Sequence, residues 1–302
     1  MAGHADGAAI GPATLARFGD LELVARLVVD GLVSGLHRSP FHGYSAEFSQ
    51  YRHYRPGDDL KYVDWKLFAR TDRLYTKQYR ETTNTLVALA VDTSASMAFV
   101  DGEVTKLRHA VVTAASLAHL LVGQGDSVGL IAYGARVNRY VPPRAGRGHL
   151  RALLVALARL RAEGATDTAA SIRRAADLMR RRGLLIVLSD LYDAGDPLFA
   201  SLRRAVKMGH EVIVLHVIAP AERDLPYRGD VRLEDLETGR QILMDAAGAR
   251  QAYQERFAGF GDECRHRLSR EGIDYVALDT AVSPTVALRP YLVARRRRGA
   301  HS

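Results

Sequence analysis

Three uninterrupted apolar runs, separated by segments of helical spacing, constrain the fold of this chain more than any other feature. The runs are TLVALAVD (85–92), LLIVLSD (184–190) and HEVIVLHVI (210–218). Such runs are typical of strands that are buried on both faces in a parallel sheet covered by helices. Between the first two runs, residues 103–124 place apolar side chains at helical intervals. The alternation predicts an α/β fold with a doubly wound, mostly parallel sheet.

The other elements follow from the same periodicities. Further strands are expected at 126–134, 136–141 and 273–280, and helices at 14–35, 149–160, 167–182, 196–208, 246–271 and 284–298. Two short strands flank the ETG of VRLEDLETGRQILMD, which predicts a small β-hairpin insertion near 230–245.

The chain divides into three parts on this basis. Residues 1–13 are small and rich in Gly and Ala, and are expected to be a disordered N-terminus. Residues 14–84 form an N-terminal segment of helix, loops and short strands, because 36–84 is rich in Tyr, Arg, His and Asp with weak periodicity. Residues 85–298 form the main domain, which includes the hairpin insertion.

Charge and cysteine content narrow the possible partners and compartments. The net charge is +8, and ARRRR (294–298) lies near the C-terminus, but no aromatic-interleaved basic patch accompanies it. We therefore interpret this tail as solvated and expect no nucleic-acid partner. The single cysteine, Cys264, excludes an intramolecular disulfide and favours a reducing compartment. No apolar run approaches the roughly 20 residues that cross a bilayer, so a cytoplasmic protein without a transmembrane segment is expected.

Oxygen-bearing side chains follow two of the predicted strands at the point where each strand ends. Asp92, Ser94 and Ser96 come directly after the first apolar run, and Asp190 ends the second. Thr166 lies in the loop GATDT (164–168), just before a predicted helix. The carboxyl ends of parallel strands form one edge of a sheet, and ligands bind there. We expect these five side chains to converge.

Hydroxyl and carboxylate oxygens are suited to Mg²⁺ or Mn²⁺, which prefer about six oxygen ligands and keep several waters. Ser94, Ser96 and Thr166 can provide neutral oxygens, while Asp92 and Asp190 can bind directly or hold the metal-bound waters. A metal held through water stays electron-poor, so it would accept an acidic side chain from another protein. A lysine at the centre of the five groups would overturn this hypothesis.

The constellation resembles the metal-ion-dependent adhesion site (MIDAS) of von Willebrand factor A domains. Their pattern is Asp-x-Ser-x-Ser, then a Thr in a later loop, then an Asp after a later strand. DTSAS (92–96), Thr166 and Asp190 match all of these positions in order. The first motif alone is a weak signal, but its placement after an apolar strand makes the combination specific.

The segment before this strand resembles the signature of the DUF58 family of bacterial proteins, which carry a von Willebrand factor A-like domain. That signature has the form R-x-Y-x-P-G-D-D, then I/V-D-W, then A-R, then K and E. The matching positions here are Arg52, Tyr54, Pro56, Gly57, Asp58, Asp59, Val63, Asp64, Trp65, Ala69, Arg70, Lys77 and Glu81. We interpret Trp65 as a packing anchor against the main domain, within a network of ion pairs.

The resemblance implies a role without enzymatic activity. DUF58 proteins commonly accompany MoxR-type AAA+ ATPases, so the implied function is that of an adaptor or co-chaperone in protein maturation or complex assembly. The expected partner is such an ATPase or a client protein that supplies an acidic residue. No small-molecule substrate is expected.

Three alternatives remain open from the residues alone. Ser94 or Ser96 could simply cap the following helix, and Asp190 the next one. A Mg²⁺-dependent phosphoryl-transfer hydrolase could use Asp92 as nucleophile, although Ser94 stands where such enzymes carry a second acid. A nucleic-acid-binding protein would rest on the basic charge alone.

Overall fold

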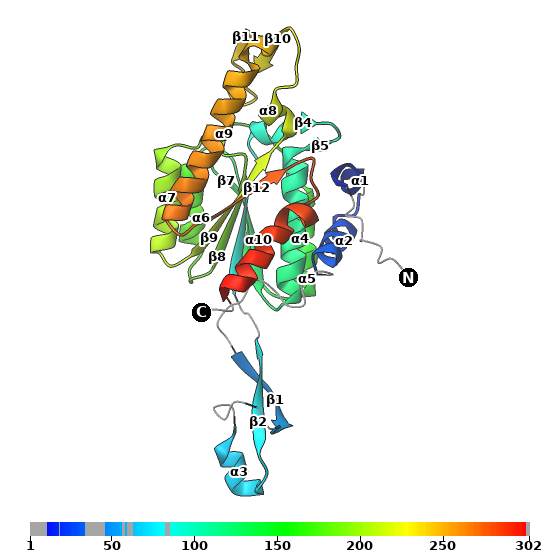
Figure 1. Cartoon of the computed structure of the whole chain (residues 1–302), viewed down its shortest axis with the longest axis vertical. Helices are drawn as coiled ribbons and strands as arrows, with labels where there is room; N and C mark the ends of the chain where they lie inside the picture. Colours follow the sequence, from blue (N-terminus) through cyan, green and yellow to red (C-terminus); the bar gives the residue numbers. More distant parts are fainter. Residues whose placement is uncertain are drawn as a thin grey trace.

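The computed structural model describes residues 11–17, 19–33, 46–55, 58, 63–81 and 85–299. The main body is a six-stranded sheet between two layers of helices (Figure 1). The expected disordered N-terminus falls mostly on residues 1–10, outside the described residues, and the first helix begins at Pro12. No helix of the described ranges combines the length and apolar character needed to cross a membrane.

The sheet has the strand order β12-β9-β8-β3-β6-β7. Its neighbouring pairs are parallel, except that the edge strand β7 runs antiparallel to β6. The strands are β3 (Leu86–Asp92), β6 (Ser127–Tyr133), β7 (Val137–Arg144), β8 (Leu184–Ser189), β9 (Glu211–Ile218) and β12 (Asp274–Asp279). The predicted mostly parallel α/β sheet is confirmed, and each predicted strand of the main domain is present.

The register at the centre of the sheet determines where the loops meet. β3 pairs with β8 on one side and β6 on the other, and Val91 lies opposite Leu188. Asp92 at the end of β3 and Asp190 just after β8 therefore leave the same edge of the sheet side by side. Every residue of β3 after Leu86 is buried, which is why the run carries no polar side chain before Asp92.

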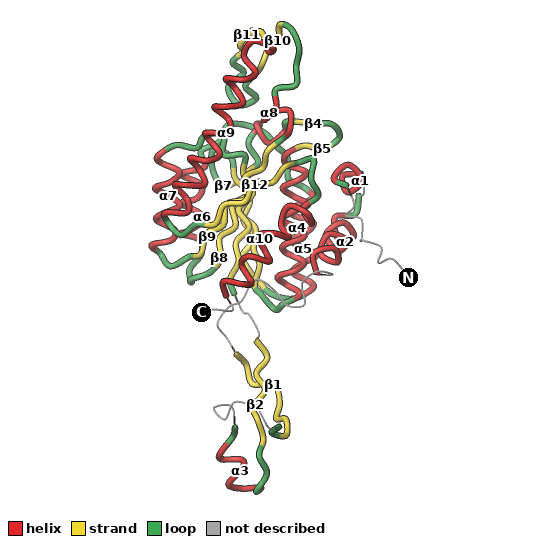
Figure 2. Tube along the Cα trace, in the orientation of Figure 1, coloured by secondary structure: helices red, strands yellow, loops and turns green. Residues whose placement is uncertain are grey.

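Helices cover both faces of the sheet, as the continuous apolar strands require. One face carries α4 (Lys106–Gly123) and α5 (Arg147–Ala158), with α2 (Leu21–Val33) packed outside α4 and α10 (Pro284–Gly299) packed against α2 and β12. The other carries α6 (Thr168–Leu178), α7 (Asp196–Lys207) and α9 (Ala246–Arg270). Figure 2 shows the two helical layers on either side of the strands.

The N-terminal helix differs from the single helix expected over 14–35. It is divided into α1 (Pro12–Arg17) and α2, with Gly19 and Asp20 between them. The Asp20 carboxylate accepts hydrogen bonds from the amides of Glu22 and Leu23, so it caps the new helix and explains the break.

The arginine-rich end of α10 is less solvated than expected. Arg295 pairs with Glu211 at the start of β9, and its guanidinium also lies 3.6 Å from Asp274 on β12. The Arg295 side chain is largely buried as a result, so at least this arginine fixes the helix to the sheet.

The signature segment forms a separate ribbon of two antiparallel strands, β1 (Ala46–His53) and β2 (Tyr75–Glu81), with helix α3 (Trp65–Thr71) between them. In Figure 1 this ribbon extends from the edge of the sheet opposite the strand ends described above. Arg52 pairs with Asp58 at 2.8 Å, as the expected ion-pair network requires. Trp65 is 57% exposed and contacts only the Phe68 ring among the described aromatic residues, so its interpretation as a packing anchor is wrong.

The hairpin insertion is confirmed as β10 (Asp230–Glu234) and β11 (Gln241–Asp245). It follows the short helix α8 (Pro220–Asp224) and leads directly into α9, whose N-cap is Asp245. Figure 1 shows the hairpin above the carboxyl edge of the sheet. Cys264 lies on the buried face of α9, and burial raises the pKa of its thiol to about 11.

Candidate metal centre at the carboxyl edge of the sheet

Asp92 is one of the two most deeply buried of the predicted ligands, together with Ser94. Its Oδ1 accepts a hydrogen bond from the Ser94 amide at 2.9 Å, and its Oδ2 accepts one from the Ser189 hydroxyl at 2.7 Å. Burial and then the neighbouring Asp190 carboxylate raise the pKa of Asp92 to about 7. Two acids therefore share one small region, and negative charge there is poorly compensated.

The two serines lie together beside this carboxylate. Their hydroxyl oxygens are 3.0 Å apart, and both residues are buried. Ser94 occupies the N-cap position of the short 3₁₀ helix η2 (Ala95–Ala98), but its side chain makes no capping hydrogen bond. Capping therefore does not account for Ser94, and the paired hydroxyls are free to act as oxygen donors.

The loop that carries Thr166 is fastened to the serine loop by backbone hydrogen bonds. The Ala95 amide donates to Gly164 O at 2.8 Å, and the Glu163 amide donates to Thr93 O at 2.9 Å. The Thr166 hydroxyl lies 3.2 Å from that of Thr168. The convergence of the loops is thus present, although Thr166 points its hydroxyl toward Thr168.

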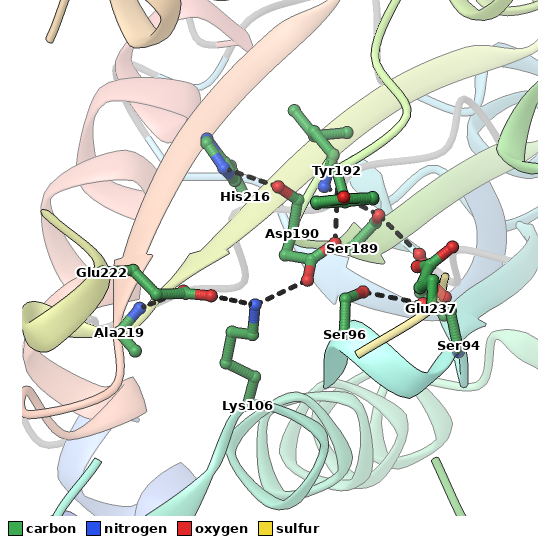
Figure 3. Close-up of polar contacts among 12 residues, drawn as sticks. Ser94, Ser96, Lys106, Ser189, Asp190, Tyr192, His216, Ala219, Glu222 and Glu237 are labelled. Carbon is green, nitrogen blue, oxygen red and sulfur yellow. Dashed lines mark hydrogen bonds and ion pairs between the residues drawn. The ribbon is translucent and has the colours of Figure 1, made fainter. Parts of the chain in front are cut away.

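Asp190 also reaches this edge, but a lysine holds one of its oxygens. Lys106 Nζ lies 2.6 Å from Asp190 Oδ2 and 2.6 Å from Glu222 Oε1, and the lysine is almost fully buried. Burial works to lower the pKa of Lys106, but the two carboxylates outweigh it, and the net pKa is raised. In Figure 3, Lys106 lies between Asp190 and Glu222, while Ser94, Ser96 and Glu237 lie on the other side of Asp190.

Lys106 and Glu222 were missed by the sequence analysis. One signal was available, because Lys106 stands in the first turn of α4, where the helix dipole disfavours a cation. A lysine at such a position suggests a specific acidic partner. Its partners lie 84 and 116 residues away in the chain, so their identity depends on the tertiary structure.

His216 fixes the backbone behind Asp190. Its Nε2 lies 3.0 Å from Asp190 O, and its Nδ1 lies 2.7 Å from the Tyr275 hydroxyl. Burial lowers the pKa of His216 to about 4, so the ring is neutral at physiological pH. The histidine therefore acts as a hydrogen-bonding support and adds no charge.

A fourth acid, Glu237, enters the site from the turn of the β10–β11 hairpin. Its Oε2 accepts a hydrogen bond from the Thr166 amide at 2.9 Å. Its Oε1 is buried and accepts no hydrogen bond from the described residues. Burial raises the pKa of Glu237, and the Thr166 amide and the hydroxyls of Ser96 and Ser94 oppose that rise. The sequence analysis placed the hairpin but did not connect it to the site.

The donor chemistry of these residues fits a hard divalent cation. Four carboxylates, those of Asp92, Asp190, Glu222 and Glu237, lie in this region, and among the described ion pairs Lys106 contacts only Asp190 and Glu222. Buried charges of one sign are costly unless a counter-charge is present. The unpartnered Glu237 Oε1 and the paired serine hydroxyls give oxygens where such an ion could bind.

The hydroxyl donors are essential to that fit. No group of three or more His, Cys, Asp or Glu side chains within the described ranges is arranged to hold a metal by itself. Ser94 and Ser96 would be direct donors, with Asp92 and Thr166 acting directly or through water. Asp190 would share its carboxylate with Lys106.

The comparisons with known proteins agree with this architecture. Residues 50–263 match a family described as "Protein of unknown function DUF58". An uncharacterised protein of Mycobacterium tuberculosis, Rv1480, is 34% identical over 242 residues, which cover 78% of this chain and 75% of that protein. Another, YeaD of Bacillus subtilis, is 31% identical over 121 residues, which cover 40% of this chain and 28% of that protein.

A solved structure supports the fold. The crystal structure of an aerotolerance-related membrane protein from Bacteroides fragilis matches with a TM-score of 0.50 and 17% identity, covering 71% of this chain and 99% of that one. The likeness concerns the fold alone, and it agrees with the sheet order and helical layers described above.

Proposed function

The chain belongs to the DUF58 family and has a von Willebrand factor A-like domain, and from this premise we propose that it is a metal-dependent protein-interaction module. It binds Mg²⁺ or Mn²⁺ at the carboxyl edge of the sheet and uses the ion to capture an acidic side chain of a partner. The observation that carries the proposal is the convergence of Asp92, the paired hydroxyls of Ser94 and Ser96, and the Thr166 loop at one buried, acid-rich point.

Each residue of the proposed metal site has a distinct role. Ser94 and Ser96 supply neutral oxygens, so they leave the ion electron-poor. Asp92 is held in place by Ser189 and its own loop amide and balances the ion's charge. Asp190 is oriented by Lys106 through its carboxylate. When bound, the ion would supply a Lewis-acidic position for a carboxylate.

The partner we propose is a MoxR-type AAA+ ATPase, with the chain as adaptor or co-chaperone in protein maturation or complex assembly. This part of the proposal comes from the family, whose members commonly accompany such ATPases. We further propose that the module binds without catalysing a reaction, because position 94 carries a hydroxyl where phosphoryl-transfer enzymes of the aspartate type carry a second acid.

The test of metal binding is a thermal-shift titration. Mg²⁺ or Mn²⁺ should raise the Tm of the wild type, and Ser94→Ala should lose most of that rise. The matched control is Ser116→Ala, which removes a buried hydroxyl that bonds only the Val112 carbonyl within α4. It should keep the metal-induced rise. A wild-type Tm that does not respond to either ion would contradict the proposal.

The test of partner binding is affinity purification of the tagged chain from its native cells in Mg²⁺ and in EDTA. The amount of MoxR-type ATPase retained should fall in EDTA and in Ser94→Ala, but not in Ser116→Ala. Equal retention under all conditions would show that the metal site is not the docking point.

A further inference from the structure

In the folded chain, the proposed metal site is not accessible to a partner protein. Ser94 is fully buried, Asp92 is 1% exposed and Ser96 is 7% exposed. A partner's carboxylate could reach these donors only if something covering them moved. The group that lies against them is the carboxylate of Glu237, which belongs to the same chain (Figure 3).

Glu237 has the chemistry and placement expected of the partner's acid. One carboxylate oxygen is fixed by the Thr166 amide, and the other is buried without a hydrogen bond from the described residues. The hydroxyls of Ser96 and Ser94 are near enough to the Glu237 carboxylate to oppose the rise of its pKa. A buried carboxylate oxygen without a donor is costly, and a cation beside the serines would remove that cost.

The turn that presents Glu237 is ordered by its own hydrogen bonds. Asp235 Oδ1 accepts from the Glu237 amide at 2.9 Å and from the Thr238 amide at 3.3 Å. The Thr238 hydroxyl also donates a hydrogen bond to Asp235 Oδ2. The turn thus holds the glutamate in one orientation toward the site.

The rest of the hairpin is weakly held. Neither β10 nor β11 contains a buried residue, and Leu236, Ile242 and Leu243 are exposed. An isolated two-stranded hairpin is marginally stable in water, and segments with few buried contacts open at low cost. The hairpin can therefore leave the site without unfolding the sheet.

We propose that Glu237 is an internal ligand of the metal centre, which occupies in cis the coordination position meant for a partner's carboxylate. The hairpin then acts as a built-in competitor, and a partner binds by displacing it. This inference rests on the proposed metal-dependent function and adds the regulation of that same site.

The variant that tests it is Glu237→Gln, which keeps the size of the side chain and an oxygen for the Thr166 amide but removes the charge. The matched control is Glu234→Gln on the same hairpin, whose carboxylate accepts a hydrogen bond from Gln241 across the strands and from no other described residue. Both variants remove one negative charge from the same hairpin. A difference between them therefore reflects the position of Glu237 at the metal site and not the loss of charge itself.

Two readouts use the metal alone. Hydrogen–deuterium exchange of residues 230–245 should slow severalfold on adding Mg²⁺ to the wild type and to Glu234→Gln, and should not change in Glu237→Gln. The water-proton relaxivity of bound Mn²⁺ should be higher in Glu237→Gln, because a water takes the place of the carboxylate. The Mg²⁺ affinity of that variant should fall by about tenfold.

The outcomes separate the two proposals. If the wild type binds the ion but its hairpin exchange is unaffected, or if Glu237→Gln matches Glu234→Gln in both readouts, the internal ligand is overturned and the metal-dependent function stands. If the wild type binds neither Mg²⁺ nor Mn²⁺, both are overturned. The inference is supported if Mg²⁺ protects the hairpin in the wild type and in Glu234→Gln but not in Glu237→Gln, and if the relaxivity of bound Mn²⁺ rises only in Glu237→Gln.

Discussion

At the scale of single residues, Lys106 is a buried cation that pairs with two carboxylates at once. Its ammonium group is the one cation that contacts Asp190 and Glu222 in the described contacts; Lys106 and Asp190 are shielded from water, and Glu222 is partly exposed. Removing one partner of a buried ion pair strands the remaining charge, and such changes cost about 3–5 kcal/mol.

We therefore expect Lys106→Met to lower the free energy of unfolding by about 3–5 kcal/mol, as measured by urea denaturation. The double variant Lys106→Met/Glu222→Gln should recover part of the loss, because one of the stranded charges is gone. Lys207→Met at the exposed end of α7 is the control and should change stability by less than about 0.5 kcal/mol. Equal losses of stability in Lys106→Met and Lys207→Met would refute the interpretation that Lys106 compensates buried carboxylates.

His109 should make the stability of the fold depend on pH, and a single substitution can isolate this contribution. The ring is buried in α4, its Nε2 lies 3.0 Å from Val282 O, and burial lowers its pKa below the usual value near 6.5. The unfolded chain then binds a proton that the folded chain does not, so this histidine's contribution to stability is present above about pH 6.5 and is lost as the pH falls below it.

The change to test is His109→Gln, because a glutamine can still donate to Val282 O but does not titrate. Between about pH 7 and pH 5, the variant should lose less stability than the wild type in denaturant titrations. His266→Gln, an exposed position on α9, should follow the wild type. A variant that loses as much stability as the wild type on acidification would argue against a role for His109.

At the scale of elements, the edge of the sheet depends on a close approach between β6 and β7. A side-chain carbon added at Gly129 would lie 2.6 Å from Val141 O and 2.8 Å from Pro143 N. Both are backbone atoms of β7 and cannot turn aside, so only glycine allows the two strands to pair at this point.

Gly129→Ala should consequently destabilise the fold by about 1–3 kcal/mol, measured as a loss of Tm and of denaturant midpoint. Gly148→Ala is the control within α5, since nothing lies within 4 Å of the added carbon. Alanine favours helices over glycine, so the control should be neutral or slightly stabilising. Destabilisation of similar size in both variants would count against the close-approach argument.

The elements also show which parts of the structure the sequence could predict. The apolar runs predicted β3, β8 and β9 directly, because burial on both faces excludes polar residues. The proposed ligands Asp92 and Asp190 followed from where the runs of β3 and β8 end. Lys106 and Glu237 could not be predicted, because each depends on a contact between residues more than seventy positions apart. The exposure of Trp65 was not predicted for the same reason, because the local sequence does not determine which residues pack against a side chain.

At the scale of the whole molecule, the β1–β2 ribbon and the sheet domain are separate structures in the described residues. Trp65, the only tryptophan, lies on the ribbon and is more than half exposed. Its fluorescence therefore reports the ribbon and gives little information about the core.

Unfolding followed by two probes should reveal this division. Far-UV circular dichroism should show the cooperative loss of the sheet domain, while Trp65 fluorescence should change little across that transition. Two-state unfolding requires coincident transitions, so the two curves are expected to differ. Iodide should quench Trp65 in the native protein almost as well as in urea. Coincident curves with a quencher-protected native tryptophan would show that the ribbon docks on the sheet domain.

The burial of Cys264 has a practical consequence for studying the molecule. Its thiol is the only one in the chain, is shielded on the buried face of α9 and ionises only in strongly alkaline solution. A maleimide dye at neutral pH should leave it untouched, so a cysteine introduced on the exposed rim of the hairpin, for example Leu236→Cys, would be labelled alone. Spin or fluorescent reporters could then follow the hairpin in solution without first engineering away a native thiol.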